Sequence, residues 1–543
     1  MAGLWAAYQL AKAGIPTVLV TYGGRDRGGL QGSSRRAVGA FNCLALTHPD
    51  IETYLRELGM GQTHPSVARM LRDYFRPALD ELRALFDMKP VKVGLALASG
   101  NGGAFLQDMY RRFQEAGGEV IDGWVTRLVA DEGQCRGLQY ESPRGIGKVR
   151  CAAMVLASGG YVSLFSNSIP TYSFGSVLGY YLQAGGVATN LEFLFRHGYG
   201  NVDARTLTPT EELPGAEIYD SKQHRVTWLE QLLFQGQGTN SHLQAVQFWL
   251  RNRDVKFFVD LSYRPLYVKF HELKLLIERR GETASENGLE DWIREAVGMF
   301  PAPAQGRIRS KLHGWLVTGK AFAYEMFEEL KADFQLARRE RFQVRPLSHF
   351  SMGGMGHVDF ATNLKNVFVT GEAMHDFGAN RVGGLPWSLY LAAGLKLREQ
   401  IQARLSAQDE DGDGDFDLVS KRSVFDRRLL RAIQERLFEC QDKGLTAQRA
   451  RACIDWLRQT RQGLLARSES LHDGTSWLIV AEAIMQSSLC RPESRGFFIR
   501  LDYPTRNEHL DQLYSCSWYD PQTDRVHAQL IPWSDIESRI RKG

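Results

Sequence analysis

Apolar and polar positions predict alternating helices and strands in the first part of the chain. Residues 1–22 show a helical pattern, with Ala and Leu on one face, that leads into a fully apolar strand. Residues 105–160 predict a helix, then strands of alternating polarity, then the buried strand of VRCAAMVLASGGY, which ends at a Gly-Gly turn. We therefore expect two strand-to-glycine turns in one sheet.

The pattern changes in the middle of the chain. Residues 200–345 are mixed polar, aromatic-rich and helical with fewer glycines, which predicts an inserted domain. Glycine-rich strand patterns return in 346–408, so this stretch and 1–199 are expected to form two parts of one nucleotide-binding domain. An acidic segment, 409–417, separates them from an Arg- and Leu-rich helical tail, for which we expect a C-terminal helical domain over 420–543.

Composition narrows the class of protein. A chain of 543 residues exceeds one ordinary core, and 43% apolar with 24% charged residues is typical of a globular protein. The net charge of +4 is too small and too evenly spread to indicate nucleic-acid binding. No apolar run reaches the roughly 18 residues that span a bilayer. Seven dispersed cysteines without a C-x-x-C pair indicate a reducing, cytoplasmic location and no metal or iron–sulfur site within the chain.

The acidic segment DEDGDGDFD invites a calcium interpretation. Its aspartates match positions 1, 3, 5 and 7 of an EF-hand loop, with Gly414 at position 6. Position 12 is Ser420, where the loop requires a bidentate Glu. The sequence therefore favours a solvated linker, and we predict no metal site.

Two glycine-rich motifs carry candidate chemistry. SHFSMGG places His349 beside a flexible Met-Gly-Gly turn, and GANRVGG places Arg381 between glycines. Glycine lets the backbone approach a planar ligand closely. Arg offers a bidentate fork to a carboxylate, and His adds a further hydrogen bond to the same anion. Taken singly, each motif also fits an ordinary structural residue.

Together and in this order, the motifs resemble the flavoprotein subunit family of fumarate reductase and succinate dehydrogenase, which also contains L-aspartate oxidase and adenylylsulfate reductase. VLASGGY is similar to the family's A-T-G-G-Y, HFSMGG to H-Y-x-M-G-G, and GANRVGG to G-A-N-R-L-G-G. AGGVATNLEFLFRH, TGEA and ESRGFFIRLDYP have counterparts as well. The resemblance covers most of the chain. It implies an α/β fold, with a Rossmann-like FAD-binding domain, an inserted α+β capping domain and a C-terminal helical domain.

The resemblance implies FAD as the cofactor and a set of residues around it. Ser33 aligns with the histidine to which respiratory members attach the flavin, and serine cannot make that link, so non-covalent FAD is expected. The expected cofactor-binding residues are Gly3, Ser34, Gly39, Ala157, Gly159, Gly160, Glu372, Arg381, Ser388 and Leu389.

The opening segment MAGLWAAYQLAKAG resembles the end of an FAD fingerprint. A dinucleotide fold begins with a strand, a G-x-G-x-x-G turn and a helix, and only the last glycine of that pattern is present, as Gly3. We expect a strand and two further glycines before Met1. The alternative is that a neighbouring segment fills the same place in the sheet.

The catalytic residues also follow from the resemblance. In the family, His and Arg hold the substrate carboxylates while hydride passes between flavin N5 and the substrate. His349 and Arg381 match these clamps, and His197 matches the His of the family's Q-F-H segment. Thr210 and Glu211 resemble a Thr-Glu pair at the front of the capping domain, although a solvated turn explains that pair equally well.

One position departs from the family. GTNSHLQAV is the best counterpart of the capping-domain segment that carries the proton-donating Arg, and it places His242 at that point. With an ordinary pKa near 6.5, His is a suitable general acid. A helix-surface role for His242 is equally open, and Arg251, Arg253 and Arg264 are alternative cations for a second carboxylate.

The leading functional hypothesis is reduction of a fumarate-type alkene, and Met352 follows the reductase pattern. Two alternatives stay open: L-aspartate-oxidase-like C–N oxidation, and an electron-transfer or scaffold subunit with a degenerate substrate site. Because the chain has no cysteine cluster, the resemblance implies that electrons enter from, or leave to, a separate iron–sulfur subunit or other redox protein, oxygen as an acceptor, or a soluble reductant.

Overall fold

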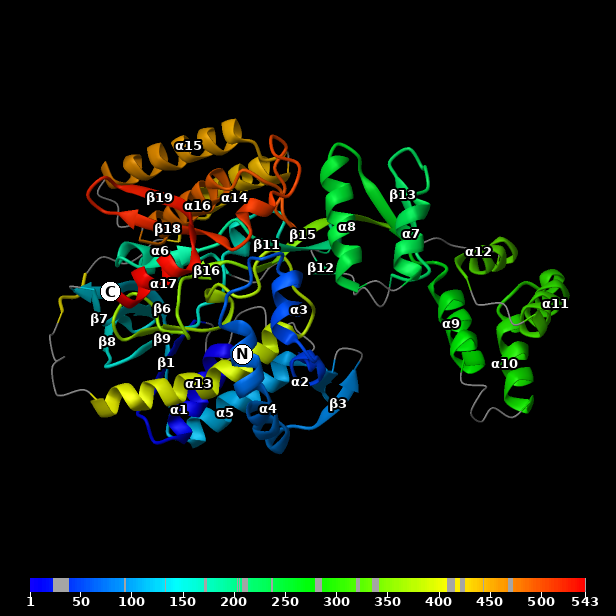
Figure 1. The fold of residues 1–543 in the computed structure, drawn as a ribbon, viewed down its shortest axis with the longest axis horizontal. Helices are drawn as coiled ribbons and strands as arrows, with labels where there is room; N and C mark the ends of the chain where they lie inside the picture. The colour runs from blue at the N-terminus through cyan, green and yellow to red at the C-terminus, as the bar shows by residue number, and fades with distance from the viewer. Residues whose placement is uncertain are drawn as a thin grey trace. The chain divides into compact units, whose positions relative to one another are not determined.

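The computed structural model describes most of the chain, and the chain forms two compact units (Figure 1). Unit 1 comprises Met1–Arg196 and Ser348–Gly543, and unit 2 comprises His197–Leu347. The described residues are 1–22, 39–91, 94–131, 133–169, 173–202, 204, 206–207, 213–235, 238–278, 286–318, 323–334, 341–407, 416–419, 425–442, 444–466 and 472–542. The domain limits drawn from the sequence stay predictions.

Two parallel strand pairs lie in unit 1. Strand β1 (Val18–Thr21) pairs with β5 (Glu119–Asp122), and β9 (Met154–Leu156) pairs with β17 (Val367–Val369). Helix α1 (Ala2–Lys12) precedes β1 and is buried along almost its whole length. Its Trp5 indole donates to Leu391 O at 2.9 Å, which fixes it to helix α13 (Leu385–Ala407). The Ala-rich sequence of α1 permits this close packing on several sides.

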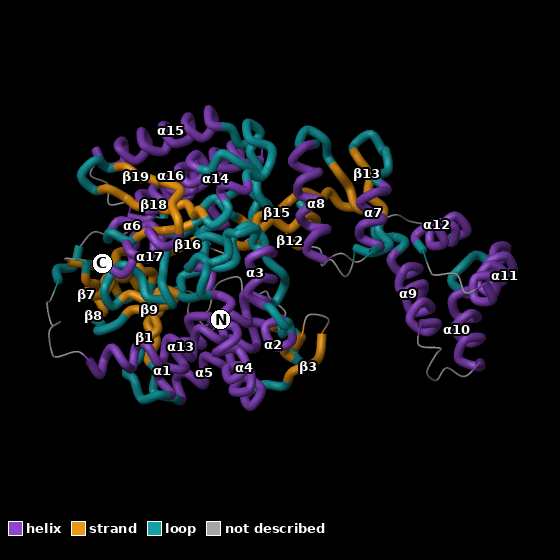
Figure 2. Tube along the Cα trace, in the orientation of Figure 1, coloured by secondary structure: helices purple, strands orange, loops and turns teal. Residues whose placement is uncertain are grey.

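The remaining elements of unit 1 cover these strands and build three further sheets, of order β2-β4-β3, β6-β7-β8 and β16-β10-β18-β19 (Figure 2). The strands of these sheets are β2 (Ala40–Asn42), β3 (Met88–Val91), β4 (Gly94–Leu97), β6 (Trp124–Asp131), β7 (Gln134–Ser142), β8 (Gly145–Arg150), β10 (Val187–Thr189), β16 (Gly354–Met355), β18 (Leu513–Asp520) and β19 (Arg525–Pro532). The helices are α2 (Leu44–Thr47), α3 (Ile51–Leu58), α4 (Val67–Leu85), α5 (Gly102–Glu115), η3 (Val162–Leu164), α6 (Ser176–Gln183) and η6 (Gly371–Ala373).

The C-terminal tail belongs to unit 1. It carries α14 (Arg427–Asp442), α15 (Ala447–Ala466), α16 (His472–Cys490), η7 (Glu508–Leu510) and α17 (Trp533–Lys542). Its hairpin β18–β19 joins the antiparallel sheet through β10, where Ala188 faces Ser517. The tail is therefore helical with one added hairpin, and it completes a sheet begun more than three hundred residues earlier.

Unit 2 contains a sheet of order β12-β11-β15-β14-β13, with helices α7 (Thr227–Phe234) and α8 (Gly238–Arg251). The strands are β11 (Leu194–Asn201), β12 (Thr206–Leu207), β13 (Glu217–Asp220), β14 (Phe257–Asp260) and β15 (Arg341–Ser351). Strands β11 and β15 are the segments in which the chain passes between the two units.

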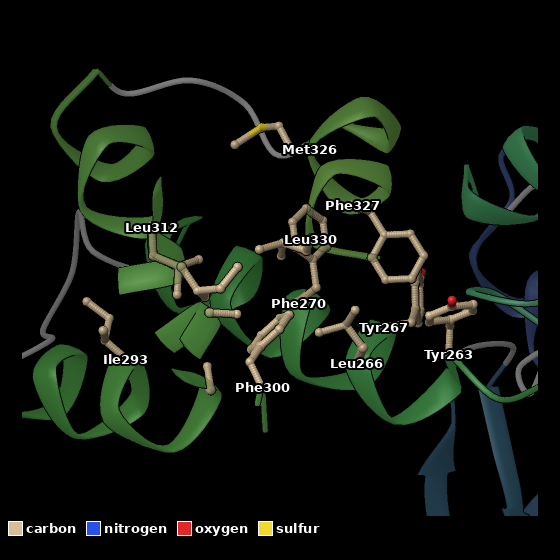
Figure 3. Close-up of a cluster of buried hydrophobic side chains, with 13 residues drawn as sticks. Tyr263, Leu266, Tyr267, Phe270, Ile293, Phe300, Leu312, Met326, Phe327 and Leu330 are labelled. Carbon is tan, nitrogen blue, oxygen red and sulfur yellow. The ribbon is translucent and has the colours of Figure 1, made fainter. Parts of the chain in front are cut away.

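A helical group, α9 (Arg264–Glu278), α10 (Glu286–Gly298), α11 (Ala302–Thr318) and α12 (Tyr324–Asp333), follows in unit 2. Its apolar side chains, among them Phe270, Phe300 and Phe327, meet in a hydrophobic core of their own (Figure 3). The aromatic-rich pattern of the inserted region is explained by this core.

Across the described part of the chain, no helix is both long enough and apolar enough to cross a membrane.

Candidate active site

The strands β9 and β17 end side by side. Their parallel register places Leu156 opposite Val369. In α/β sheets, ligands bind outside the carboxyl ends of parallel strands. The segments 157–161 and 370–373, which contain the predicted glycine turns, therefore lie where a ligand is expected.

Helix α1 begins at the same place. A Cβ on Gly3 would lie 2.7 Å from the Cβ of Ala157, so only glycine allows the helix to pack this closely on the turn after β9. The first N–H groups of a helix have no partner within the helix, and they favour anions such as phosphate. Gly3 and Ala157, both predicted cofactor-binding residues, are thus brought together at a helix N-terminus that suits a diphosphate.

Glu372, Gly160 and Ser351 form a second contact between predicted motifs. The buried Glu372 carboxylate accepts a hydrogen bond from Ser351 N at 2.9 Å, and Ser351 Oγ accepts one from Tyr161 N at 2.9 Å. A Cβ on Gly160 would lie 2.7 Å from Glu372 Oε1. Three stretches of chain, the turns after β9 and β17 and the end of β15, are locked together by these bonds.

Arg381 is buried between two aromatic rings. Its guanidinium carbon lies 4.4 Å from the centre of the Phe195 ring and 4.4 Å from that of Phe350, and the residue is only 6% exposed. Among the described residues, none accepts a hydrogen bond from Arg381 Nε. Burial lowers the pKa of Arg381, and the neighbouring Asp376 carboxyl opposes that shift. A buried N–H donor of a cation that has no acceptor is costly, which is the setting expected for a group that binds an anion.

His349 lies close to the same aromatic pair. Its ring centre is 6.2 Å from that of Phe195, the ring that Arg381 covers. His349 and Arg381, the two predicted carboxylate clamps, are therefore both neighbours of Phe195 although they come from separate motifs.

Asp376 and Tyr390 are site residues that the sequence analysis missed. Tyr390 Oη, from α13, donates to Asp376 Oδ2 at 3.0 Å, and Phe377 N donates to Asp376 Oδ1 at 2.5 Å. Burial raises the pKa of Asp376 to about 8. The signal available in the sequence was an acidic residue five positions before Arg381 in a strongly apolar, glycine-rich stretch.

Gly39, Ser388 and Leu389 gather around the start of α13. Ser388 Oγ donates to Asn42 O at 2.9 Å, and Leu389 is fully buried. Asn42 ends β2, the strand that follows Gly39, and Leu97 N donates to Gly39 O at 3.0 Å. The strand β2 therefore links these three predicted cofactor-binding residues. Gly159 lies in the turn after β9, next to Gly160.

The remaining predicted site residues lie in unit 2 or outside the described residues. His197 is a buried residue of unit 2, and its Nδ1 accepts a hydrogen bond from Tyr199 N at 3.3 Å. His242 lies within α8, but its side chain is outside the described part of the structure. The predictions on Ser33 and Ser34, on Thr210 and Glu211, and on the acidic segment up to Ser420 also lie outside the described residues.

Taken together, these features fit a dinucleotide cofactor of the FAD type. A helix N-terminus suits its diphosphate, and Glu372 supplies a buried carboxylate beside the glycine turn. Arg381 supplies a buried donor, its Nε, that lacks an acceptor in the part of the chain that the structure describes. No group of three or more His, Cys, Asp or Glu side chains within the described residues is arranged to hold a metal ion. The fold is thus that expected of a dinucleotide-binding protein, and the same unit holds Arg381, a buried arginine between two aromatic rings.

Comparison with known proteins agrees with this class. Residues 465–538 match the family model described as fumarate reductase flavoprotein C-term. A fumarate reductase flavoprotein subunit from Helicobacter pylori is 29% identical over 196 residues, which cover 30% of this chain and 27% of that protein. An L-aspartate oxidase from Pyrococcus furiosus is 22% identical over 372 residues, 66% of this chain and 62% of that protein. This chain therefore covers between about a quarter and three fifths of the length of these relatives.

Among solved structures, the FrdA chain of E. coli quinol fumarate reductase superposes with a TM-score of 0.68 at 17% identity. The superposition covers 98% of this chain and 94% of that one, so the two share a fold throughout. The chain therefore shares the fold of the fumarate reductase and succinate dehydrogenase flavoprotein family, and adenylylsulfate reductase is also among its structural neighbours. The family binds FAD.

Proposed function

We propose that this protein is an FAD-dependent oxidoreductase that reduces a small carboxylate-bearing alkene of the fumarate type. The observation that carries the proposal is Arg381, a buried guanidinium held between Phe195 and Phe350 whose Nε has no acceptor among the described residues. A carboxylate would supply that acceptor through a charge-assisted hydrogen bond.

Each residue then has a physical task. Arg381 binds and orients the carboxylate, and His349, a neighbour of the same Phe195 ring, adds a second hydrogen bond to it. Because the anion is held by a positive group, electron density is drawn from the conjugated alkene, which favours attack at one alkene carbon. Glu372 and the Gly159–Gly160 turn hold the cofactor. Bound FAD would supply the hydride to one alkene carbon, and the other carbon takes a proton, for which His242 is the candidate donor named from the sequence.

An anaerobic titration tests the proposal. The flavin of the purified protein is reduced with dithionite, and fumarate is then added while the absorbance of oxidised flavin is followed. We expect fumarate to restore that absorbance. If the flavin reduces but neither fumarate nor a panel of related unsaturated acids reoxidises it, this function is excluded.

We propose that the FAD is bound without a covalent link, since Ser33 stands where respiratory members have the attaching histidine. Acid precipitation of the holoprotein should leave a colourless pellet and a yellow supernatant. A yellow pellet would contradict this proposal. Electrons would then enter from a separate redox partner, with an iron–sulfur protein as the first candidate.

Amino-acid oxidation is a second candidate, because the match to the Pyrococcus furiosus L-aspartate oxidase covers 66% of this chain, the longer of the two sequence matches. A carboxylate of L-aspartate would occupy the same position at Arg381. Production of hydrogen peroxide from L-aspartate under air, without reoxidation by fumarate, would select this candidate over the reductase.

A further inference from the structure

Cys440 and Cys453 are two buried thiols on neighbouring helices of the C-terminal tail. Cys440 lies on α14 and Cys453 on α15, with 5% and 1% of their surfaces exposed, and both are free thiols in the structure. The Cys440 thiol donates to Arg449 O, on α15, at 3.6 Å. The proposed reaction uses neither cysteine.

The register of α15 places the Cys453 side chain beside that contact. In an α-helix, the carbonyl of Arg449 accepts from the N–H four residues later, which is that of Cys453. A helical side chain tilts towards the helix N-terminus and covers the turn before its own Cα, so the Cys453 side chain lies over the turn that contains Arg449. The Cys440 sulfur reaches the same turn, and the two thiols lie within hydrogen-bonding reach of each other.

A second contact shows that α14 and α15 run antiparallel at this pair. The guanidinium carbon of Arg436, one turn before Cys440, lies 5.2 Å from the ring centre of Trp456, about one turn after Cys453. Contacts on both sides of the pair therefore hold the two helices in one register. The side chains of Arg436 and Glu439 are 40% and 48% exposed, so the thiols lie just below the surface of the tail.

The surroundings make Cys440 the better nucleophile of the two. The hydrogen bond from Cys453 lowers the pKa of Cys440 most, and with the positive charges of Arg436 and Arg449 it outweighs burial and the Glu439 carboxylate. The same hydrogen bond, followed by burial, raises the pKa of Cys453. Because the thiolate is the reactive form, Cys440 is suited to attack an oxidant, and Cys453 is placed to react with the oxidised sulfur.

We propose that Cys440 and Cys453 are a redox-active dithiol, which hydrogen peroxide oxidises to a disulfide between α14 and α15. In the first step the Cys440 sulfur attacks a peroxide oxygen, the O–O bond breaks, and water leaves as Cys440 becomes a sulfenic acid. In the second step the Cys453 sulfur attacks that sulfur, the S–O bond breaks, the S–S bond forms and a second water leaves. Two electrons pass from the thiols to peroxide, and both thiol protons end in the waters. Neither step depends on the proposed function.

Peptide mapping of the folded holoprotein tests the proposal. The protein is treated with hydrogen peroxide, its remaining thiols are blocked, and it is digested with trypsin without reductant. The tryptic peptides LFECQDK and ACIDWLR, which contain Cys440 and Cys453, should be joined, and dithiothreitol should release them. The same treatment in urea should join them less, because the register of α14 and α15 is lost there.

Serine variants assign the two roles. Cys453→Ser has no second thiol at the pair, so peroxide should leave a sulfenic acid at Cys440 that dimedone traps. In Cys440→Ser, the less acidic Cys453 should react with peroxide several-fold more slowly. Cys135→Ser is the matched control, because Cys135 is a buried thiol that likewise donates to a backbone carbonyl, that of Gly137, at 3.6 Å. Flavin absorbance of each variant verifies that the protein is folded.

The outcomes decide the proposal without reference to the substrate. Joined peptides in the folded parent protein and in Cys135→Ser, but in neither variant of the pair, support it. Peptides that stay separate after peroxide treatment, or that join equally in folded and unfolded protein, overturn it. Dimedone capture at Cys453 in Cys440→Ser that is as fast as capture at Cys440 in Cys453→Ser overturns the assignment of the attacking thiol.

Discussion

Two arginines in unit 1 are equally buried and surrounded in opposite ways. The guanidinium of Arg491 donates to acceptors from four stretches of chain, namely Glu192 at 2.5 Å, Glu493, Gln62 and Leu513 O at 3.0 Å, and Asn190 at 3.4 Å. Arg381 has two aromatic rings beside it and no acceptor for its Nε within the described residues.

The pKa values of Arg491 and Arg381 also shift in opposite directions. Burial by itself lowers the pKa of either group, but at Arg491 the Glu192 and Glu493 carboxylates outweigh burial and the pKa rises. At Arg381 burial prevails and the pKa falls. A buried cation whose donors all have acceptors stabilises the fold through those partners. A buried cation with a donor that lacks an acceptor destabilises the fold until a ligand supplies that acceptor.

Removal of Arg491 should give the largest effect. Arg491→Met leaves Glu192 and Glu493 buried without their cation, and we expect the free energy of unfolding to fall by about 3–5 kcal/mol. Urea unfolding of the holoprotein measures this loss. A variant as stable as the parent would show that the network contributes nothing net.

Removal of Arg381 should act on binding and spare the fold. Arg381→Met removes a buried cation whose Nε has no acceptor among the described residues, so the unfolding free energy should stay the same or rise, while carboxylate binding should weaken by about 2–5 kcal/mol, roughly thirty-fold or more. Malonate affinity and the urea midpoint, measured on the same preparation, check both halves. If Arg381→Met destabilised the protein as much as Arg491→Met does, the proposed difference between the two arginines would be wrong.

Three buried histidines lie near the hydrogen-bonded network of Arg491. The rings of His64 and His357 stack 4.0 Å apart, and His375 Nε2 lies 2.9 Å from Gln62 O. Burial lowers the pKa of His357 to about 4 and of His375 to about 3, and it lowers that of His64 well below its ordinary value. All three are therefore neutral in the folded protein at neutral pH.

Stability should consequently depend on pH. The unfolded chain binds protons at these histidines below pH 6.5 and the folded protein does not, so stability is complete above 6.5 and falls as pH decreases, by about 1.4 kcal/mol per pH unit for each neutral histidine. Urea midpoints between pH 8 and 5 test this. His357→Gln should have a shallower slope by one proton, and exposed His224→Gln an unchanged one. Equal slopes for both variants would contradict the assignment.

The smallest predicted effect concerns Gly160, in the glycine turn that we propose holds the cofactor. A Cβ in Gly160→Ala would lie 2.7 Å from Glu372 Oε1, so the turn or the carboxylate must move, and we expect FAD affinity to fall about tenfold, a cost of about 1.4 kcal/mol. Gly463→Ala, on α15 with nothing within 4 Å of its Cβ, is the control and should keep its flavin. The flavin-to-protein ratio after dialysis measures both.

The sequence predicted the features that depend on local motifs. Glycine turns after buried strands, the position of Glu372 after β17 and the start of α1 at Gly3 are consequences of short-range spacing, and the structure brings these residues together. The family and the α/β class followed from the same motifs and are confirmed.

The features that the sequence could not predict depend on burial and on long-range pairing. Glu192 and Arg491 are 299 positions apart, and no pattern of either segment indicates the other as a partner. Asp376 is an unremarkable acid in the printed sequence, and only its burial next to Arg381 and Tyr390 gives it an altered acidity. The β18–β19 hairpin in the otherwise helical tail was not predicted for the same reason, because its partner strand β10 lies far upstream in the sequence.

The nested order of the two units has a consequence for synthesis. Glu192 and β10 are made before unit 2, and their partners Arg491 and β18 are made after it. While a ribosome translates the chain, unit 2 therefore has all its own residues available at a time when Glu192 is still a solvated carboxylate. Because domains fold as units as they emerge, the inserted unit closes first and the buried ion pair forms last. The ion pair can thus form only after the whole of unit 2 has been synthesised.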